Sequence, residues 1–250
     1  MKKIVLTLLV GMSIVAFGQR PVADILPTSG GPLSIQPVSH GTLVLTWKGK
    51  TVYADPTGGA KAFEGLAEPD LIVITDIHGD HFNPETLAAI KTEHAILVVP
   101  KSVADKLPAA LKQKAVVLNN GGTTRQLEIA IAAIPMYNLP ESADSKHTKG
   151  RGNGYVLTFG NKTVYLSGDT SGIPEMRTLK NIDVAFVCMN LPYTMDIKEA
   201  ASAVLDFKPK IVYPYHYRGQ NGLSDTAEFK KLVNASDPAI DVRLRNWYPQ

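Results

Sequence analysis

Four side chains that can bind metal ions lie within the six residues 76–81. From residue 75 the chain runs Thr-Asp-Ile-His-Gly-Asp-His, which supplies Asp76, His78, Asp80 and His81. Carboxylate oxygens and imidazole nitrogens are the ligands that suit zinc, iron and manganese. A regular strand could not direct all four side chains to one ion, whereas a loop can direct them to two adjacent ions. The stretch therefore predicts a metal centre.

A predicted strand and a predicted helix flank this stretch. Residues 71–75 form an apolar, largely β-branched run, which is typical of a strand buried on both faces. Ligands of α/β proteins usually bind where such strands end. Asn83 and Pro84 predict the N-cap and the first position of a helix over 84–91. The alternative interpretation is a loop whose acids only cap this helix, although capping does not require two histidines.

Two similar series of elements are predicted along the chain. The first has strands at 33–38, 42–48, 51–54, 71–75, 95–99, 115–118 and 125–135, with helices at 84–91 and 102–107. The second has strands at 154–159, 163–167, 183–188, 211–215 and 241–244, with helices at 174–179, 197–207 and 226–233. Each series begins with strand hairpins and continues with alternating strands and helices. This order predicts an α/β fold in which two mixed sheets pack face to face, with helices on the outer faces.

The length and composition are those of an ordinary globular protein. The 250 residues are 44% hydrophobic and 20% charged, which excludes a mainly disordered chain. No linker or change of composition divides the chain, so we expect a single domain over residues 33–250 after an extended lead-in at 19–32. The sequence has one cysteine, Cys188, which excludes a disulfide within the chain and a zinc site built from several cysteines.

The first 18 residues predict a cleavable secretory signal peptide. Lys2 and Lys3 precede an apolar run over 4–17, which is shorter than the about 20 residues that span a bilayer. Ala16 and Gly18 are small residues at the −3 and −1 positions of the predicted cleavage site, as signal peptides require. The alternative is an uncleaved N-terminal anchor. Cleavage after Gly18 predicts a secreted or periplasmic protein without a stable membrane anchor. Its net charge of about +1 then excludes the basic surface that nucleic-acid binding needs.

The stretch at 76–81 resembles the signature loop His-x-His-x-Asp-His of the metallo-β-lactamase superfamily. A hairpin that ends in Asp55-Pro56 precedes this loop, and three further motifs follow it in the order of that superfamily. They are His147 in His-Thr-Lys-Gly-Arg-Gly-Asn-Gly-Tyr, Asp169 in Val-Tyr-Leu-Ser-Gly-Asp-Thr and His216 in Pro-Tyr-His-Tyr. The resemblance covers residues 33–245, and the chain is similar to the branch of ascorbate-6-phosphate lactonase and related hydrolases. It implies a four-layer αββα sandwich.

The resemblance also implies a centre for two divalent metal ions, with zinc as the first expectation and manganese or iron as alternatives. Carried over by position, His78 and His147 bind the first ion together with the residue at position 76. Asp80, His81 and His216 bind the second ion, and Asp169 bridges the two. Asp80 and Asp169 are the residues that the resemblance assigns to catalysis. A hydroxide shared by two such ions would attack an electrophilic carbon or phosphorus.

Asp76 departs from the superfamily pattern, which usually has histidine at this position. A carboxylate binds metals at about the same distance as imidazole, so we expect Asp76 to be a ligand. Its negative charge would make the first site harder and favour manganese or iron, or raise the pKa of the bridging water. The alternative is that Asp76 lies outside the ligand shell and the first site is weak or empty. The diiron flavoprotein branch changes a different position, occupied here by His78, so oxygen chemistry is not indicated.

Basic and aromatic side chains are expected around the centre. Lys146, Lys149 and Arg151 surround His147 in the sequence, and Lys149 and Arg151 are predicted to bind a phosphate or carboxylate of the substrate. The alternative is a solvated loop. Tyr193 follows a buried strand and is predicted as a hydrogen-bond donor to the substrate, with simple packing as the alternative. His40 ends an early strand and is expected to be a hydrogen-bonded structural histidine or to line the pocket.

The sequence therefore predicts a metal-dependent hydrolase that acts on a small, anionic molecule. The expected reaction is the attack of the metal-bridging hydroxide on a lactone or phosphoester-like bond. The alternative function is a binding or scaffold module that keeps the fold and one structural metal without turnover. The two functions differ in whether the first site binds a metal ion, which requires Asp76 to act as a ligand.

Cleavage of the leader can be tested on the full chain. Expression in a bacterial host is expected to yield a protein that begins at Gln19, because cleavage is predicted after Gly18. Intact mass and amino-terminal sequencing of the periplasmic fraction measure this. The full-length mass in the membrane fraction would contradict cleavage and favour the anchor.

Overall fold

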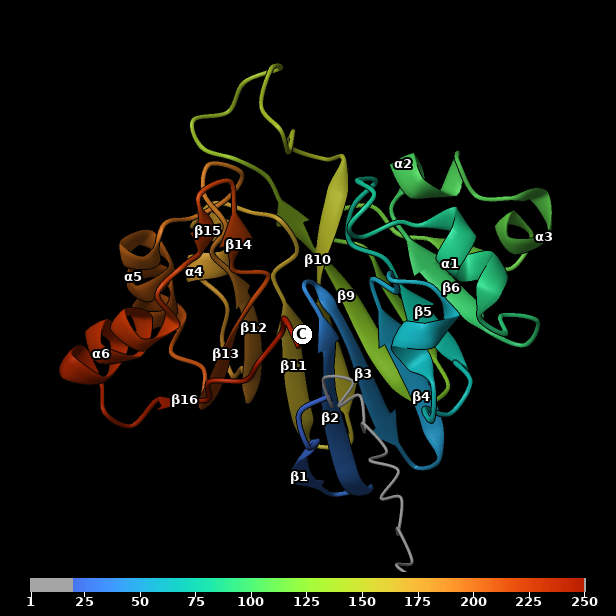
Figure 1. Cartoon of the computed structure of the whole chain (residues 1–250), viewed down its shortest axis with the longest axis horizontal. Helices are drawn as coiled ribbons and strands as arrows, with labels where there is room; N and C mark the ends of the chain where they lie inside the picture. The colour runs from blue at the N-terminus through green and yellow to red at the C-terminus, as the bar shows by residue number, and fades with distance from the viewer. Residues whose placement is uncertain (1–19, 250) are drawn as a thin grey trace, which may run out of the picture.

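Two seven-stranded β-sheets form the centre of the molecule (Figure 1). The computed structural model describes residues 20–249. In spatial order the first sheet consists of β1 (Asp24–Thr28), β2 (Gly31–Ser39), β3 (Thr42–Trp47), β4 (Lys50–Ala54), β5 (Leu71–Val73), β6 (Ile96–Val99) and β7 (Ala115–Val117). The second sheet consists of β16 (Asp241–Val242), β13 (Ile211–Tyr215), β12 (Val184–Cys188), β11 (Lys162–Leu166), β10 (Gly152–Phe159), β9 (Ile129–Met136) and β8 (Thr123–Gln126).

Both sheets are mixed, and both have the same internal order. In the first sheet β1 to β4 pair antiparallel and β4 to β7 pair parallel. In the second sheet β8 to β11 pair antiparallel, while β11, β12, β13 and β16 pair parallel. The two series of elements therefore correspond to two sheets of similar topology, except that the strand predicted at 125–135 in the first series belongs to the second sheet, as β8 and β9. The prediction of two mixed sheets in an α/β fold is confirmed.

Helices cover the outer face of each sheet (Figure 1). Outside the first sheet lie α1 (Pro84–Ala89), α2 (Lys101–Ala104) and α3 (Ala109–Lys112), with the 3-10 helix η1 (Ala60–Phe63) near them. Outside the second sheet lie α4 (Pro174–Arg177), α5 (Ile197–Phe207) and α6 (Thr226–Ser236). The short strands β14 (Arg218–Gly219) and β15 (Gly222–Leu223) form a separate hairpin. Asn83 caps α1 as predicted, because its side-chain oxygen accepts the N–H of Thr86.

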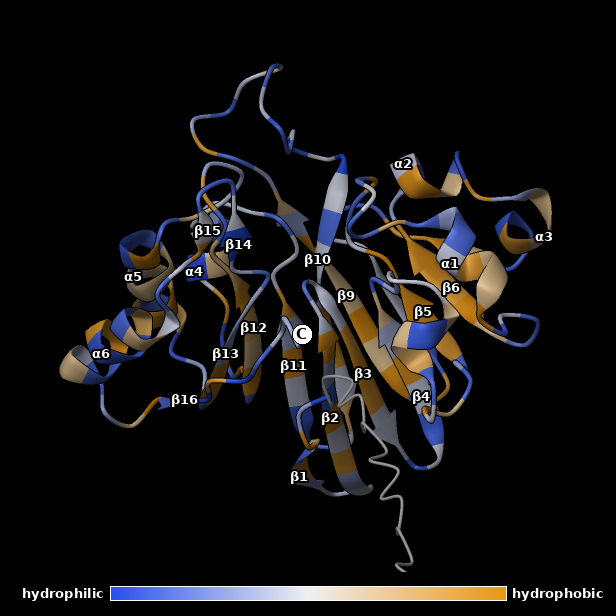
Figure 2. Cartoon of the chain, in the orientation of Figure 1, coloured by the Kyte–Doolittle hydropathy of each residue, from blue (hydrophilic) through white to orange (hydrophobic). Residues whose placement is uncertain are grey.

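Two apolar cores explain why the parallel strands are hydrophobic throughout, as Figure 2 shows for β5 and β6. Side chains alternate between the faces of a strand, so Ile72 and Val73 of β5 point to opposite sides of the sheet. Val73 belongs to the core between the sheets, together with Leu157 and Phe186 of the second sheet. Ile72 belongs to the core beneath the outer helices, together with Leu87 of α1. A parallel strand such as β5 is therefore apolar at successive residues because one face packs against the other sheet and the other face packs against the helices.

The structure corrects one predicted strand and extends one segment. Residues 125–135 were expected to form a single strand, but β8 and β9 are two strands that pair antiparallel across a two-residue turn. Both turn residues, Leu127 and Glu128, have positive φ angles of 50° and 68°. Asn-Gly is the usual sequence of such turns, so Leu-Glu gave no indication of one. In the segment 19–32, residues 24–28 form β1 and pair with β2.

The predicted signal peptide, residues 1–18, lies outside the described residues. Among residues 20–249 no helix is long and apolar enough to cross a membrane.

The carboxyl ends of the parallel strands meet at one edge of the sandwich. Ala54 of β4 pairs with Val73 of β5, so the segments that follow these two strands leave the sheet side by side. In the second sheet Leu166, Phe186 and Tyr213 are aligned across β11, β12 and β13. The loop between β9 and β10 rises above the same edge at the top of Figure 1. Loops from both sheets are thereby brought together at this edge.

Candidate metal centre

Seven candidate ligands converge at this edge in two groups. The first group is Asp76, His78 and His147, and the second is Asp80, His81, Asp169 and His216. Within each group the ligand atoms lie within 4.8 Å of one another. Zinc bonds of about 2.1 Å separate neighbouring ligands by about 3.4 Å in a tetrahedral site, so this spacing suits one ion in each group. These seven residues are the ligand set that the sequence motifs predicted.

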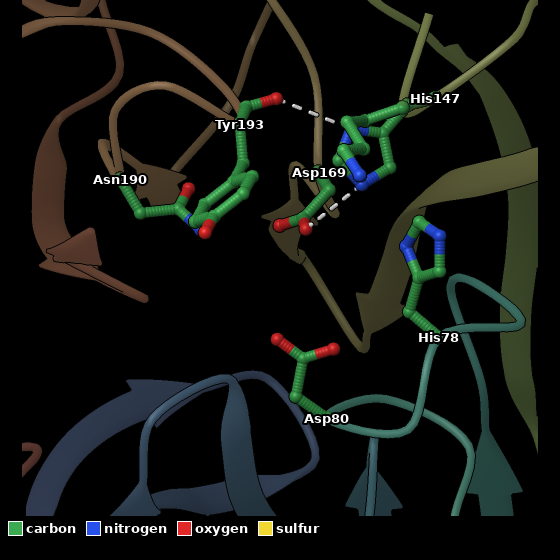
Figure 3. A pocket seen from close by; sticks show the side chains of 7 residues that line it. His78, Asp80, His147, Asp169, Asn190 and Tyr193 are labelled. Atoms are coloured by element: carbon green, nitrogen blue, oxygen red, sulfur yellow. Dashed lines mark hydrogen bonds and ion pairs between the residues drawn. The ribbon is translucent and has the colours of Figure 1, made fainter. Parts of the chain in front are cut away.

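Asp169 connects the two groups. Its Oδ2 atom lies 3.1 Å from Nε2 of His147 in the first group and 3.3 Å from Nε2 of His81 in the second. Figure 3 shows Asp169 beside His147, with His78 and Asp80 pointing towards the same space. Burial alone would raise the pKa of Asp169, but the histidines His216, His81 and His147 outweigh it and hold the pKa well below its usual range. Asp169 is therefore an anion that both groups share.

Asp80 is the most exposed carboxylate of the centre. Its Oδ2 atom lies 3.2 Å from Nε2 of His40 and 3.3 Å from Nε2 of His216, and 43% of the side chain is accessible. Burial raises the pKa of Asp80, but the contacts of its carboxylate with the imidazoles of His216 and His40 and the charge of His81 reverse this and lower it. Asp80 is therefore held as a carboxylate at the wall of the cavity.

Hydrogen bonds at Nδ1 orient two of the histidines. Nδ1 of His81 donates to Oδ2 of Asp55 over 2.7 Å, and Nδ1 of His147 lies 3.2 Å from the carbonyl oxygen of Tyr193. A proton held at Nδ1 leaves the lone pair of Nε2 free to bind a metal ion. In both residues Nε2 is the atom that faces Asp169. Asp55 and the Tyr193 carbonyl therefore select the metal-binding tautomer.

Strained backbone surrounds the second group. The φ angles of His40, Asp55 and His216 are 52°, 45° and 47°. Residues other than glycine rarely adopt such positive values. The His40 carbonyl accepts the N–H of His216 over 3.1 Å, and the two rings lie 3.8 Å apart. A Cβ atom on Gly41 would approach the His216 ring to 2.9 Å. The turn between β2 and β3 is thus shaped to let these rings pack together.

Unpaired buried atoms support the presence of metal ions. Four buried ligand atoms form no hydrogen bond of normal geometry within the part of the chain that the structure describes; they are Nε2 of His81, His147 and His216, and Oδ1 of Asp169. Buried polar atoms are nearly always paired, because an unpaired one loses its hydration without compensation. Three other buried side-chain atoms of the described residues are also unpaired, Nδ1 of His216, the hydroxyl of Tyr165 and Nε1 of Trp247, so most but not all of the unpaired atoms belong to the candidate ligands. Divalent ions would pair the four ligand atoms, so these residues fit a dinuclear centre.

A cavity of about 210 Å³ opens over the centre. It is lined by residues of four segments: His78, Asp80, Lys146, His147, Asp169, Asn190 and Tyr193. Figure 3 shows Asn190 and Tyr193, from the loop after β12, on the side of the cavity away from His78. Tyr193 therefore lines the cavity, while its predicted hydrogen bond to a substrate stays a prediction. Asn190 had not been singled out, because an amide after an apolar strand carries no distinctive pattern.

The three basic residues around His147, namely Lys146, Lys149 and Arg151, have different partners in the structure. Lys149 lies outside the cavity lining and bonds Glu141 over 3.0 Å, with its ammonium 4.5 Å from the centre of the Tyr137 ring. Arg151 bonds both oxygens of Asp76. Lys146 lines the cavity and forms no ion pair with any residue between 20 and 249. Of the three cations, Lys146 is the one left available to a bound molecule.

The sequence gives no indication of the roles of two supporting residues, Asp55 and Asn138, and leaves two roles open for a third, His40. The sequence indicates Asp55 only as the end of a hairpin, and no pattern indicates Asn138, whose side-chain oxygen accepts the N–H of His147 over 2.9 Å. His40, left open between a structural and a pocket role, bonds Asp80 and also Tyr248 over 2.8 Å. Asp55 precedes Pro56 at the end of a strand. This Asp-Pro pair is the one sequence signal that indicates a place for Asp55 at the edge of the sheet, near the ligands.

Comparison with known proteins agrees with this geometry. The sequence model of the β-lactamase superfamily domain matches residues 34–216. A UPF0173 metal-dependent hydrolase of Pyrococcus abyssi is 34% identical over 194 residues, which cover 74% of this chain and 85% of that protein.

Solved structures show the same architecture. A protein of Parabacteroides distasonis, described as a candidate metal-dependent hydrolase, is 37% identical with a TM-score of 0.79 over 89% of this chain and 97% of that one. A metallo hydrolase of Ignicoccus hospitalis is 24% identical with a TM-score of 0.71 over 86% and 95% of the two chains, and it is similar in fold.

Removal of the Asp55 carboxylate tests its role in orienting His81. Asp55→Asn is expected to weaken metal binding by about tenfold to a hundredfold, because the bond that fixes the His81 tautomer is disturbed. Chelator competition on the purified chain measures the affinity. Asp70→Asn is the matched control, since Asp70 bonds the N–H of Thr51 at the opposite end of β4 and β5. Equal affinities of the two variants would contradict the assignment.

Proposed function

The chain belongs to the β-lactamase superfamily, and from this premise we propose that it is a metal-dependent hydrolase with a centre for two divalent ions. The observation that carries the proposal is the shared carboxylate of Asp169 between two groups of buried, unpaired ligand atoms. The name of the Pyrococcus abyssi relative, a metal-dependent hydrolase, supports the same activity. Zinc is the first candidate for both ions, with manganese and iron as alternatives.

Two ions bound here would lower the pKa of water towards neutrality to supply a hydroxide, and would polarise the oxygen of the group it attacks. The protein's own contribution is to fix the ligands before substrate arrives. Asp55 and the Tyr193 carbonyl hold His81 and His147 in one tautomer. His40 and His216 hold the carboxylate of Asp80, whose accessible face can accept a hydrogen bond from water in the cavity. Rigid ligands reduce reorganisation during the reaction.

The cavity supports a small, anionic substrate. Its volume of about 210 Å³ suits a small molecule or one end of a larger one. Lys146 offers a charge that no described carboxylate neutralises, and Asn190 and Tyr193 offer polar groups in the lining of the same cavity. We propose that Lys146 binds a phosphate or carboxylate of the substrate while a lactone or phosphoester-like bond lies over the two groups. Lys149 is engaged by Glu141 and Arg151 by Asp76.

The location outside the cytoplasm is also a proposal. It is supported by the basic, apolar and small-residue pattern of residues 1–18. A hydrolase exported in this way would act on molecules that reach the cell from outside or cross its envelope.

Turnover of small esters tests the proposed reaction. The purified chain with zinc or manganese is expected to hydrolyse members of a panel of phosphorylated lactones and phosphodiesters. Asp169→Asn is expected to lower kcat/KM by about a thousandfold, because the shared anion of both groups is lost. Arg243→Gln, which removes an ion pair with Asp241 away from the centre, serves as the control. Absence of turnover across the panel by the metal-loaded chain would contradict the proposal.

Lys146 can be tested separately against its neighbour Lys149. Lys146→Gln is expected to raise KM for an anionic substrate by about tenfold with little change in kcat, because a binding charge is lost equally from ground and transition states. Lys149→Gln should leave KM unchanged, since Lys149 points to Glu141. Steady-state kinetics with an anionic and an uncharged ester measure both. The same KM in both lysine variants and in the wild type would show that Lys146 does not bind the substrate.

A further inference from the structure

Asp76 differs from the other two carboxylates of the centre in having a permanent cation bound to it. Nε of Arg151 donates to Oδ1 of Asp76 over 3.1 Å, and Nη2 donates to Oδ2 over 2.9 Å. The Asp76 side chain is fully buried, and Arg151 is 23% exposed. A two-point bond between a guanidinium and a carboxylate is strong and directional. Both oxygens of this candidate ligand are therefore engaged by one arginine.

The position of Arg151 depends on its neighbours. Its carbonyl oxygen accepts the hydroxyl of Ser102 over 2.7 Å, and its N–H donates to the carbonyl of Thr148. Gly152 follows it, and a Cβ atom at that position would lie 2.8 Å from the Thr75 carbonyl and 3.2 Å from Oδ1 of Asp76. The absence of a side chain at 152 lets the start of β10 approach the loop after β5. Arg151 is thus anchored by contacts from three segments.

Within residues 20–249, the ion-pair contacts of the other two carboxylates are all with histidines. Asp80 lies within 4 Å of His40, His81 and His216, and Asp169 lies within 4 Å of His81, His147 and His216. Histidines that bind metal are neutral, so these carboxylates keep their full charge toward an ion. The charge of Asp76 is offset by Arg151. The second group therefore presents two uncompensated negative charges, and the first presents none of its own.

We propose that Arg151 is the counterion of Asp76. The Asp76–Arg151 pair then has the same net charge, zero, as the neutral metal-binding histidine that is usual at position 76. The pair offers an oxygen ligand without adding a net charge to the first group. It follows that the second group binds its ion first and more tightly, and that Arg151 sets the affinity of the first group. The proposal rests on the dinuclear centre described above, but it concerns the binding of ions and is tested without turnover.

A simple positioning role makes the opposite prediction. If Arg151 only orients Asp76, its loss would disorder a ligand and weaken the first site, as is usual for residues that support ligands. If Arg151 acts as a counterion, its loss removes a positive charge a few ångströms from the ion and strengthens the site. The sign of the change in affinity therefore distinguishes the two roles.

Stepwise titration with Zn²⁺ measures that sign. The purified chain, stripped with a chelator, is titrated in competition with a chromogenic chelator, and two binding steps are expected. Arg151→Gln should tighten the weaker step by about tenfold and leave the tighter step unchanged. Arg151→Lys, which keeps the charge and loses the two-point geometry, should retain a weak step close to that of the wild type. Arg243→Gln, at an arginine paired with Asp241 away from the centre, should leave both steps unchanged.

Other outcomes overturn the proposal. A weaker or unchanged first-group step in Arg151→Gln would assign Arg151 a positioning role only. If the weaker Zn²⁺-binding step tightened in both Arg151→Gln and Arg151→Lys, the two-point bond to Asp76, and not the positive charge of Arg151, would be what limits metal binding.

A second pair of variants keeps the test informative if Arg151→Gln folds poorly, since it leaves Asp76 buried without a cation. Asp76→His leaves the guanidinium facing the ion without its carboxylate, so the first-group step should weaken. Adding Arg151→Gln to Asp76→His should restore that step. Far-ultraviolet circular dichroism before each Zn²⁺ titration confirms folding. An Asp76→His variant that binds both ions at least as tightly as the wild type, with or without Arg151, would contradict the counterion role.

Discussion

The buried carboxylate of Asp169 is the group on which the rest of the site depends. An anion without direct access to solvent is stable only when charges or hydrogen bonds compensate it, and divalent ions held beside Asp169 by histidines from three segments would supply that charge. Those histidines must in turn present lone pairs, which is why Asp55 and the Tyr193 carbonyl hold protons at Nδ1. His81, His147 and Asp76 are therefore each oriented by a residue that lies outside the ligand set.

The doubled sheet topology is what makes this convergence possible. Each sheet turns from antiparallel to parallel pairing, and its parallel strands deliver their carboxyl ends to the same edge. The first sheet supplies the loop after β5, and the second supplies Asp169 after β11 and His216 after β13. Left-handed backbone at Asp55 and His216 shows that the fit requires local strain, which the packed cores beneath the edge can support.

Much of this could be predicted from the sequence, and the reasons for the exceptions are physical. The helix at 197–207 and the strand at 211–215 match α5 and β13 residue for residue, because periodicity and apolar runs are local properties. The turn at Leu127 and Glu128 was missed because its residues lack the usual turn chemistry. Pairings such as Arg151 with Asp76 join residues 75 positions apart, and composition gives no measure of such contacts. Lys149 and Arg151 could be placed near the site, but not assigned to carboxylates of the protein itself.

The number of metal ions bound per chain tests the central claim most directly. Mass spectrometry of the chain purified without chelator counts the ions, and a folded, metal-loaded chain should hold about two. A single ion per chain that persists when zinc or manganese is supplied in excess would contradict a centre built around a shared Asp169. It would leave one group as a structural metal site.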